Sequence, residues 1–563
     1  MHAIPAARRR EARMSERITQ VLSLHRITPR CYDLTSVRTG SVRDQLIRAT
    51  LLADALLRSG LVAVQRRDSD DEQKAIKRKR LLVLGAGVAG VALGLSAAEQ
   101  GADVTIVEKE TYPFGTLASC YWRTVDPTEY DWPHQHWNQG SLPIVLPGAP
   151  VATGPGGPQS PIQLPLPPSR LTGSRLAGVW SSLHSSALSP PVPDSTIAVG
   201  AGSLTILYGR NANDLTIDDS LAASALATRV PGHPMLTVSD AAATELVRVT
   251  SGWTTPSWNS EKFAAIVSCI GFGEEITSER PPPPTGQRGN WNGFTGHHFW
   301  QDYDGMKRSG FFKRTNRTMP TAILISGSGD GAMQDFQRAA TGRFGRDLYE
   351  KIKSALPTGR FTPEGFMQDA ILAEDYARRA HGWRPIGASI DATFQHWHDA
   401  YERAVNEVWS RWNSATKEHE AVAKAVLRPE VINELTGSPG PRVTVRWVIR
   451  ESTPAYTYGL NRFLSLLVLR LMALLQGADH GRPHTLLTQH EIHAISPHPP
   501  HVCSGNPAGC YAIVHDVLLR NVVTHASVWN QFDLILIRHG QEASPLLGGA
   551  SVPEQQVPFD IPR

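Results

Sequence analysis

The most ordered pattern of hydrophobic and polar positions in this chain lies between residues 80 and 108. Residues 81–84 form a short apolar run, which is typical of a strand buried on both faces. Residues 104–107 form a second such run, and the small and apolar residues between the two runs predict a helix that ends at Gly101. The pattern therefore predicts a strand, a tight turn, a helix and a second strand.

The rest of the chain alternates between helical and strand patterns. Residues 17–24 and 42–61 carry apolar positions at helical spacing, and residues 346–480 are mostly helical in pattern. Residues 196–275 contain several short apolar runs that are typical of strands. Proline, glycine and serine are frequent in residues 140–195, so helices and central strands are disfavoured there. These blocks indicate several structural regions within the 563 residues.

Three glycines follow the first strand at the spacing of a dinucleotide-binding turn. Gly85 permits the tight turn, Gly87 lets a pyrophosphate approach the backbone, and Gly90 lets the helix lie close to the sheet. The helix then presents free N–H groups and the positive end of its dipole to the phosphates. Glu108 comes 18 positions after Gly90, where a carboxylate can accept hydrogen bonds from both ribose hydroxyls. We interpret this stretch as a dinucleotide site; the alternative is a glycine-rich turn without a ligand.

A second strand-to-glycine transition occurs late in the chain. Residues 321–326 are apolar and lead into Gly329, Asp330, Gly331 and Ala332, where a helix is predicted to begin. Asp330 at this turn can reach a polyol hydroxyl, and the helix N-terminus can face a phosphate. The predicted cofactor-binding residues of both turns are Gly85, Ala86, Gly87, Val88, Ala89, Gly90, Glu108, Lys109, Gly329, Asp330, Gly331 and Ala332.

The order of these motifs resembles the flavoprotein oxidoreductases that have two dinucleotide-binding domains. The glycine turn with Glu108 is the first point of resemblance, and the late Gly329-Asp330 pair is similar to the family motif whose acid holds the flavin ribitol. Between them, residues 266–271 form a strand that ends in Cys269-Ile270-Gly271, which is similar to the family's strand ending in Ala-Thr-Gly. The resemblance covers about residues 80–345.

The resemblance implies specific roles for these residues. Gly85, Gly87 and Gly90 would cradle the FAD pyrophosphate, Glu108 would bind the adenosine ribose, and Asp330 would bind the ribitol or a flavin phosphate. A complete second GxGxxG for NAD(P)H is absent between the first motif and the Asp330 turn. Residues 326–331 are therefore also considered as a degenerate nicotinamide site.

The expected fold class is α/β. We expect a Rossmann-like FAD/NAD(P)-binding domain with a β-rich insertion, a helical N-terminal extension and a mainly helical C-terminal region. The predicted parts are an N-terminal extension and linker (1–78), the Rossmann-like domain (79–345) with a Pro/Gly-rich insert (140–195), a helical cap or substrate domain (346–480), and a C-terminal region (481–563) with a closing strand at 532–538.

Catalytic groups are not identified by any motif. His134, His136, His297 and His298 are candidates for a general base by residue type alone. The first two lie in a segment rich in aromatic residues, 121–137, which is either a ring-stacking or substrate surface or a loop held by aromatic packing.

Composition narrows the range of functions. The formal charge of +4 is small for this length and does not favour nucleic acid as a partner. The five cysteines include no CxxC pair, which excludes dithiol redox chemistry and fits a reducing cytoplasm. No secretory signal is visible, and the apolar run 463–475, which contains Arg470, is expected to be a buried helix rather than a membrane span. The histidines of residues 480–515 fit no zinc spacing, so no metal is expected.

The leading functional hypothesis is an FAD-dependent oxidoreductase that takes electrons from NAD(P)H or an organic donor. Its expected partners are the dinucleotide and a small-molecule substrate. One alternative is a non-catalytic FAD- or NAD(P)-binding sensor or interaction protein; another is an NAD-dependent dehydrogenase. Glu108 disfavours NADP at the first turn because a carboxylate repels a 2′-phosphate, although neighbouring Lys109 weakens that effect. The Arg538-His539-Gly540 tripeptide after the last strand is also found in histidine phosphatases, but a closing strand is preferred here.

Overall fold

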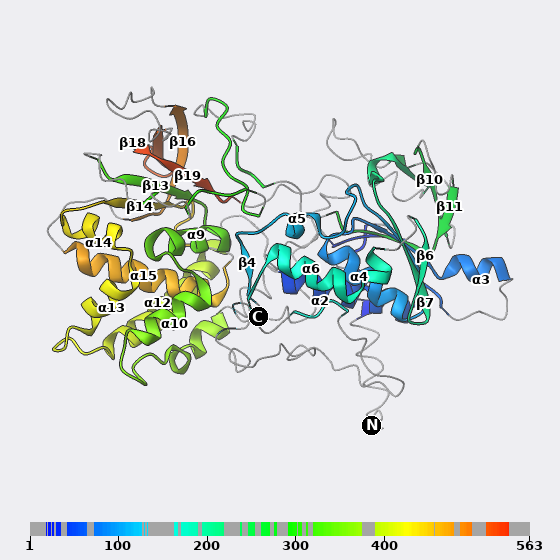
Figure 1. The fold of residues 1–563 in the computed structure, drawn as a ribbon, viewed down its shortest axis with the longest axis horizontal. Coiled ribbons are helices and arrows are strands. Elements are labelled where there is room, and N and C mark those ends of the chain that lie inside the picture. The colour runs from blue at the N-terminus through cyan, green and yellow to red at the C-terminus, as the bar shows by residue number, and fades with distance from the viewer. Residues whose placement is uncertain are drawn as a thin grey trace.

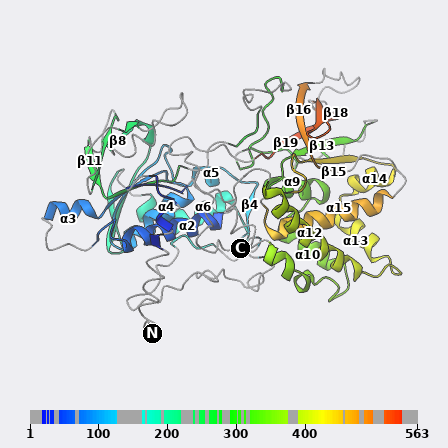
Figure 2. The same cartoon turned by 180° about the vertical axis from the view of Figure 1, so that it is seen from behind.

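The computed structural model contains two α/β units that lie side by side along the long axis of the molecule (Figures 1 and 2). The structure describes residues 18–539 except residues 20, 24, 28–29, 35–41, 65–71, 127–128, 130–131, 133–162, 167–169, 190–193, 219–236, 239–245, 254–259, 271–274, 279–290, 301, 307–310, 313–318, 374–388, 455–456, 478–484 and 498–513.

The first unit is built on a six-stranded sheet in the order β1-β12-β2-β3-β7-β6. Its strands are β1 (Cys31–Asp33), β2 (Arg80–Leu84), β3 (Asp103–Val107), β6 (Thr196–Val199), β7 (Gly202–Leu207) and β12 (Ala265–Ser268). All neighbouring pairs are parallel except β6 with β7. The predicted α/β class with a parallel Rossmann-like sheet is therefore confirmed.

Helices cover the first sheet, and a smaller sheet extends from it. The helices are α2 (Val42–Arg58), α3 (Glu72–Arg78), α4 (Val88–Glu99), α5 (Gly115–Ala118), α6 (Gly173–Leu183) and α7 (Ser185–Leu188). The smaller sheet, in the order β11-β10-β8-β9, consists of β8 (Leu215–Asp218), β9 (Thr237–Val238), β10 (Val247–Ser251) and β11 (Ser260–Phe263), and a short hairpin pairs β4 (Thr124–Val125) with β5 (Leu171–Thr172). Within residues 196–275, where the β-rich pattern was predicted, β8–β11 form this smaller sheet, whereas β6, β7 and β12 belong to the first sheet.

The N-terminal extension belongs to the first unit. Strand β1 pairs in parallel with β12, and α2 packs on α4. Leu52, Ala53 and Leu56 of α2 are fully buried there. The boundary expected at residue 78 is corrected by this finding, because long-range pairing brings the extension into the sheet.

The second unit is built on a four-stranded parallel sheet in the order β15-β14-β13-β19. Its strands are β13 (Thr321–Ser326), β14 (Val443–Val448), β15 (Leu486–Leu487) and β19 (Leu534–Ile537), and an antiparallel sheet adds β16 (His490–Pro497), β17 (His515–Asn521) and β18 (Ser527–Phe532). Its helices are α9 (Asp330–Thr341), α10 (Gly345–Ser354), α12 (Ser389–Ser410), α13 (Glu418–Val426), α14 (Pro429–Thr436) and α15 (Gly459–Gln476).

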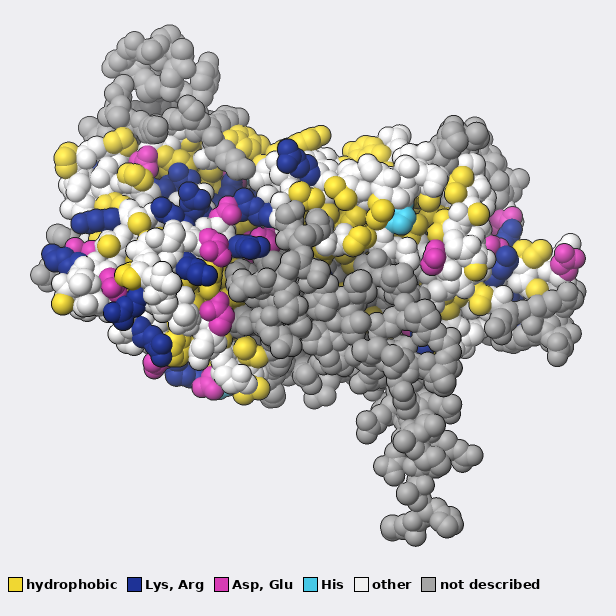
Figure 3. Space-filling view, turned by 60° about the horizontal axis from the view of Figure 1, so that its bottom comes forward, with side chains coloured by type: hydrophobic (Ala, Val, Ile, Leu, Met, Phe, Trp, Pro, Cys, Tyr) yellow, Lys and Arg dark blue, Asp and Glu magenta, His cyan; other side chains and the backbone are white. Residues whose placement is uncertain are grey.

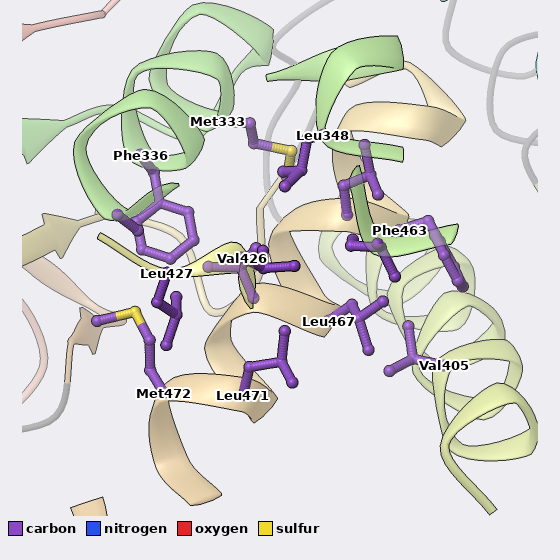
Figure 4. Packing of buried hydrophobic residues seen from close by; sticks show 14 of the residues in the cluster. Met333, Phe336, Leu348, Val405, Val426, Leu427, Phe463, Leu467, Leu471 and Met472 are labelled. Atoms are coloured by element: carbon purple, nitrogen blue, oxygen red, sulfur yellow. The ribbon is translucent and has the colours of Figure 1, made fainter. Parts of the chain in front are cut away.

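Helix α15 is the central helix of the second unit. Figure 4 shows Phe463, Leu467 and Leu471 of α15 packed among Val405 and Val426 of neighbouring helices. Among the described residues, α15 is the one helix long and apolar enough to cross a membrane, but 61% of it is buried inside the protein. Its burial supports the expected core helix, since core helices of soluble proteins pass the same test.

The two units repeat one topology. In the first unit the central parallel strands lie in the order β12-β2-β3-β7, and in the second they lie in the order β19-β13-β14-β15. In both, a small sheet precedes the last of these strands in the chain. It is antiparallel in the second unit, and in the first it is antiparallel except for the parallel pair of β8 with β9. This repeat corrects the boundaries expected at residues 345 and 480, because β13 and α9 form one unit with the helical region and the C-terminal strands. The sequence could not show this, since strands far apart in the chain complete the second sheet.

Candidate functional site

The first glycine turn joins β2 to α4, and two of its glycines are required by protein contacts. Gly85 has φ +99°, and a Cβ there would lie 2.7 Å from the carbonyl oxygen of Cys269, which follows β12. A Cβ at Gly90 would lie 1.8 Å from the Gly85 carbonyl oxygen. Helix α4 also lies close to the sheet one turn later, where a Cβ at Gly94 would meet Ile106 at 2.8 Å.

Gly87 is different, because no protein contact accounts for it. Its φ of −71° and ψ of −172° are available to any residue, and no described atom lies within 4 Å of the position of its Cβ. Gly87 is the N-cap of α4, so this open space faces the helix N-terminus. A pyrophosphate would fit there against the backbone, which is the role the sequence predicted.

Glu108 reaches back across the turn. Its carboxylate accepts hydrogen bonds from the N–H of Ala86 at 2.5 Å and the N–H of Glu110 at 2.9 Å. Each oxygen keeps the capacity to accept a further hydrogen bond. Lys109 points to solvent, with its ammonium 3.8 Å from the Glu110 carboxylate. The turn and Glu108 are therefore brought together as the sequence predicted, with the carboxylate beside the space at Gly87.

The second glycine turn joins β13 to α9 and repeats the geometry of the first. Gly327 has φ +139°, and a Cβ there would lie 2.1 Å from the carbonyl oxygen of Arg538, which follows β19. Gly329 is the N-cap of α9 with φ −92°, and within the described residues nothing lies within 4 Å of its Cβ position. With Ala332 completely buried in third place, the turn fits the G-x-G-x-x-A form of the motif. The sequence analysis considered residues 326–331 only as a degenerate nicotinamide site, because it required a third glycine.

The second turn belongs to its own sheet, which changes the interpretation of Asp330. Its carboxylate accepts hydrogen bonds at 2.9 Å from the N–H of Tyr458 and from the amide of Asn461, both at the start of α15. These contacts give no support to the ribitol or flavin-phosphate role implied by the resemblance. The other hypothesis, a nicotinamide site at residues 326–331, agrees with the repeated geometry. Gly331 lies beside Phe299: a Cβ at Gly331 would lie 3.3 Å from the Phe299 ring.

Two of the four candidate histidines lie between the units. The backbone carbonyl of His297 accepts a hydrogen bond from Arg538. The His298 ring lies 3.6 Å from the Glu275 carboxylate, and burial raises the pKa of Glu275. His134 and His136 lie outside the described residues. These contacts bring His298 near the junction of the units but assign no general base.

A buried cluster of charges connects the two units, and sequence reasoning missed it. Arg123 of the first unit binds Asp335 of α9 at 2.6 Å and Asp304 at 3.3 Å. Arg338 binds Asp304 at 2.7 Å and Asp335 at 2.8 Å, and Arg538 binds Asp335 at 2.8 Å. Burial alone would raise the pKa of Asp335, but the three guanidinium groups outweigh it and hold that pKa well below its usual range. No sequence motif signals the pairs of Arg123 and Arg538, because they join distant segments; the Arg338–Asp335 pair lies within α9.

The segment after Arg123 continues into the second unit. Glu129 is buried beside Gly345 at the start of α10, and burial, together with Asp126 and Asp330, raises its pKa well above the usual value. Trp132 is only 2% exposed and packs against Tyr349 and Phe463, with ring centroids 6.4 and 5.2 Å away. For this tryptophan, aromatic packing rather than a substrate surface is observed.

Neither the surface charge nor a cluster of metal ligands indicates a further site in the described residues. On the face shown in Figure 3, Lys and Arg side chains of the second unit are interspersed with Asp and Glu. Within the described ranges, no group of three or more His, Cys, Asp or Glu residues could hold a metal ion. Much of the histidine-rich segment 480–515 lies outside those ranges.

Comparison with protein families finds a match to the part of the chain that contains the first turn. A family model described as the FAD binding domain matches residues 80–120 of this chain. The match spans β2, the glycine turn, α4, β3 and Glu108. No curated protein matches the chain. The family match confirms FAD as the predicted cofactor and confirms the resemblance to flavoprotein oxidoreductases.

Solved structures with similarity to this chain include three named redox enzymes. Thioredoxin reductase of Lactococcus lactis is 9% identical, with 82% of this chain and 77% of that chain covered and a TM-score of 0.28. Ornithine N-hydroxylase of Kutzneria sp. 744 is 10% identical, with 82% and 80% covered and a TM-score of 0.32. The cadaverine monooxygenase DfoA of Erwinia amylovora, bound to FAD, is 10% identical, with 84% and 80% covered and a TM-score of 0.31. Scores this low place no individual residue of this chain.

Proposed function

We propose that this protein is an FAD-dependent oxidoreductase in which FAD binds at the first glycine turn and a nicotinamide dinucleotide binds at the second. The observation that carries the proposal is the pair of open glycines, Gly87 and Gly329. Each lies at the N-terminus of a twelve-residue helix, in a backbone conformation that does not need glycine. A ligand that approaches the backbone gives a reason for glycine at both positions.

The residues at the first turn fit FAD. The N–H groups at the start of α4 would bind the pyrophosphate, and the free acceptor capacity of Glu108 would bind the hydroxyls of the adenosine ribose. When bound, FAD supplies the hydride and electron chemistry of such an enzyme. The protein binds and orients the cofactor and excludes competing reactions.

The buried contacts between the units support communication between the two sites. Arg123 follows the first turn in the chain and ends on Asp335 in α9, which begins at the second turn. The Arg123 guanidinium lies 3.9 Å from the ring centre of Phe299, and Phe299 also lies beside Gly331. A fixed arrangement of this kind would hold two bound dinucleotides in a constant relation.

The test of this proposal is the colour and reduction of the purified protein. We expect a yellow protein that releases FAD on acid treatment, identified by chromatography. Anaerobic addition of NADH or NADPH should bleach the flavin absorbance. A colourless protein that binds NAD(H) would contradict the proposal and favour the dehydrogenase or the sensor. Cytoplasmic location and a small-molecule substrate remain parts of the same proposal.

A further inference from the structure

The repeated topology allows the sugar-binding ends of the two turns to be compared residue by residue. In the first unit, Glu108 donates its N–H to the last residue of β7 at 3.0 Å and accepts from the N–H of Arg210 at 2.9 Å. In the second unit, Ile449 donates its N–H to the last residue of β15 at 3.0 Å and accepts from the N–H of His490 at 2.9 Å. The two backbones make the same contacts, so Ile449 is the counterpart of Glu108.

The flanking bonds confirm this register. The N–H of Gly85 donates to Val107 at 2.7 Å, and the N–H of Gly327 donates to Val448 at 3.0 Å. Residues 107 and 448 are therefore counterparts, as are the residues that follow them. Arg450 consequently occupies the position of Lys109.

The second unit has Ile449 where the first has Glu108, and this difference changes which ribose the second site can accept. Ile449 is buried and apolar, so it offers no acceptor for a ribose 2′-hydroxyl and no charge to repel a phosphate. Arg450 follows directly and its side chain is 74% exposed. A guanidinium on the residue after the missing acid suits a 2′-phosphate, because it can donate two parallel hydrogen bonds to phosphate oxygens.

Charged side chains of both signs surround Arg450. Its Nε lies 3.8 Å from the Glu491 carboxylate, which also binds Arg520 at 2.6 Å. Two guanidinium groups therefore share one carboxylate. Glu451 is exposed and adds a negative charge next in the chain, which would weaken but not remove the attraction for a phosphate.

We infer that the second site selects NADP(H) over NAD(H), with Arg450 as the residue that binds the 2′-phosphate. This inference rests on the proposed function, since it names the dinucleotide of the second site. The two sites then have opposite preferences: Glu108 suits the free ribose hydroxyls of FAD, and Ile449 with Arg450 suits the phosphorylated ribose of NADP.

The test combines flavin reduction in the FAD-loaded protein with binding of small probes. We expect NADPH to reduce the flavin at concentrations at least about tenfold lower than NADH. Calorimetry should show 2′,5′-ADP binding more tightly than 5′-ADP. Arg450→Ala should weaken binding of NADPH and 2′,5′-ADP by about 10- to 100-fold and leave NADH unchanged. Arg403→Ala, an exposed arginine on α12, should change neither.

Two further outcomes separate the inference from the proposed function. If NADH and NADPH reduce the flavin equally well, or if Arg450→Ala weakens both equally, the inference is overturned while the proposed function stands. If neither dinucleotide binds or reduces the flavin, the proposed function fails and the inference fails with it. Glu451→Gln should strengthen binding of 2′,5′-ADP, since it removes the opposing charge; unchanged binding of both probes in this variant and in Arg450→Ala would count against the inference.

Discussion

At the scale of single residues, the glycines separate into those that the fold needs and those that it does not. Gly85 and Gly327 have positive φ values and lie against a carbonyl oxygen, so a side chain at either position would strain the turn. Gly87 and Gly329 have ordinary φ values and open surroundings in the described structure. Substitution of the second pair should therefore affect ligands and leave the fold intact.

Gly87→Val is expected to abolish retention of FAD while the protein stays folded. The valine side chain would occupy the space assigned to the pyrophosphate, and we expect affinity for FAD to fall at least about tenfold. The measurements are the FAD content after purification and the circular dichroism spectrum. Gly178→Val on the exposed side of α6, where the Cβ position is equally open, serves as the control. Full FAD content in Gly87→Val would contradict the assignment.

Gly329→Val should have the complementary effect. This variant is expected to retain FAD and remain yellow, because the first turn is untouched. Its flavin should no longer be reduced by NADPH at concentrations that reduce the wild type, with an increase in apparent Kd of at least about tenfold. Stopped-flow absorbance under anaerobic conditions measures this. Loss of FAD in this variant would instead place the flavin at the second turn.

His25 carries a prediction about pH. It is completely buried, and burial, with the nearby charge of Arg48, lowers its pKa to about 3, despite a hydrogen bond to the Asp33 carbonyl. The unfolded chain takes up a proton near the ordinary value of 6.5. The free energy of unfolding should therefore fall as pH decreases from about 6.5 to about 3, by a few kcal/mol in total.

The measurement is the midpoint of urea unfolding at pH 7.5 and at pH 5.5, for the wild type and for two histidine variants. His25→Asn cannot take up this proton, so its midpoint should fall less between the two conditions than that of the wild type. His525→Asn, at an exposed turn position with φ +58°, is the control and should behave as the wild type does. Equal losses in His25→Asn and in the wild type would show that another group determines the acid sensitivity.

At the scale of elements, α9 is the helix on which the two units depend. It begins at the second glycine turn and presents Asp335 to arginines from three different segments. One carboxylate thus joins the segment after α5, the helix itself and the residue after β19. Asp304 is the only other carboxylate to which the described ion pairs join these arginines.

Asp335→Asn should lower the free energy of unfolding by about 3–5 kcal/mol, because it leaves three buried guanidinium groups with a single carboxylate. The stabilisation by the ionised Asp335 is present above pH 4 or so and is lost as pH falls below that, since its pKa is lowered in the folded state. Urea unfolding at pH 7 measures the difference. Asp347→Asn removes an exposed partner of Arg170 and should cost less than about 1 kcal/mol. Similar losses in both variants would argue against a special role for the cluster.

At the scale of the whole molecule, the segment from Arg123 to Trp132 holds the two units together. It begins in the first unit with a buried ion pair and ends with an indole ring inside the second unit. Trp132 also donates a hydrogen bond from Nε1 to Glu364 at 3.3 Å. The relative position of the units therefore depends on buried side chains and not on surface contacts alone.

Trp132→Ala should loosen the junction of the units. Truncation of a buried tryptophan costs about 3–5 kcal/mol, and here the loss falls on the contact between units. Small-angle scattering should show a larger radius of gyration, and limited proteolysis should cut between the units. Trp253→Ala removes a buried indole within the first unit and should reduce stability without separating the units. An unchanged radius of gyration in Trp132→Ala would show that the ion cluster suffices.

The sequence predicted those features that depend on neighbouring residues and missed those that depend on contacts between distant segments. The strand, glycine turn, helix and acid of residues 80–108 were predicted correctly because neighbouring residues determine them. The second turn was recognised as a strand-to-helix transition, but the sequence did not show that Asp330 binds the start of α15. Arg123 and Asp335 carried no signal, because they lie far apart in the chain, and for Trp132 the aromatic-rich segment left a substrate surface and aromatic packing as alternatives.

The sequence by itself determined the class of the fold and the strand, glycine turn and helix around Gly85–Gly90, since periodicity and glycine spacing act over a few residues. Only the tertiary structure decided that residues 321–537 form a second unit with the topology of the first, that Ile449 corresponds to Glu108, and that buried charges join the units. The physical reason is that strand pairing and the burial of charge depend on contacts between segments up to hundreds of residues apart. Such contacts bring Arg123 and Asp335 together with a sequence separation of 212.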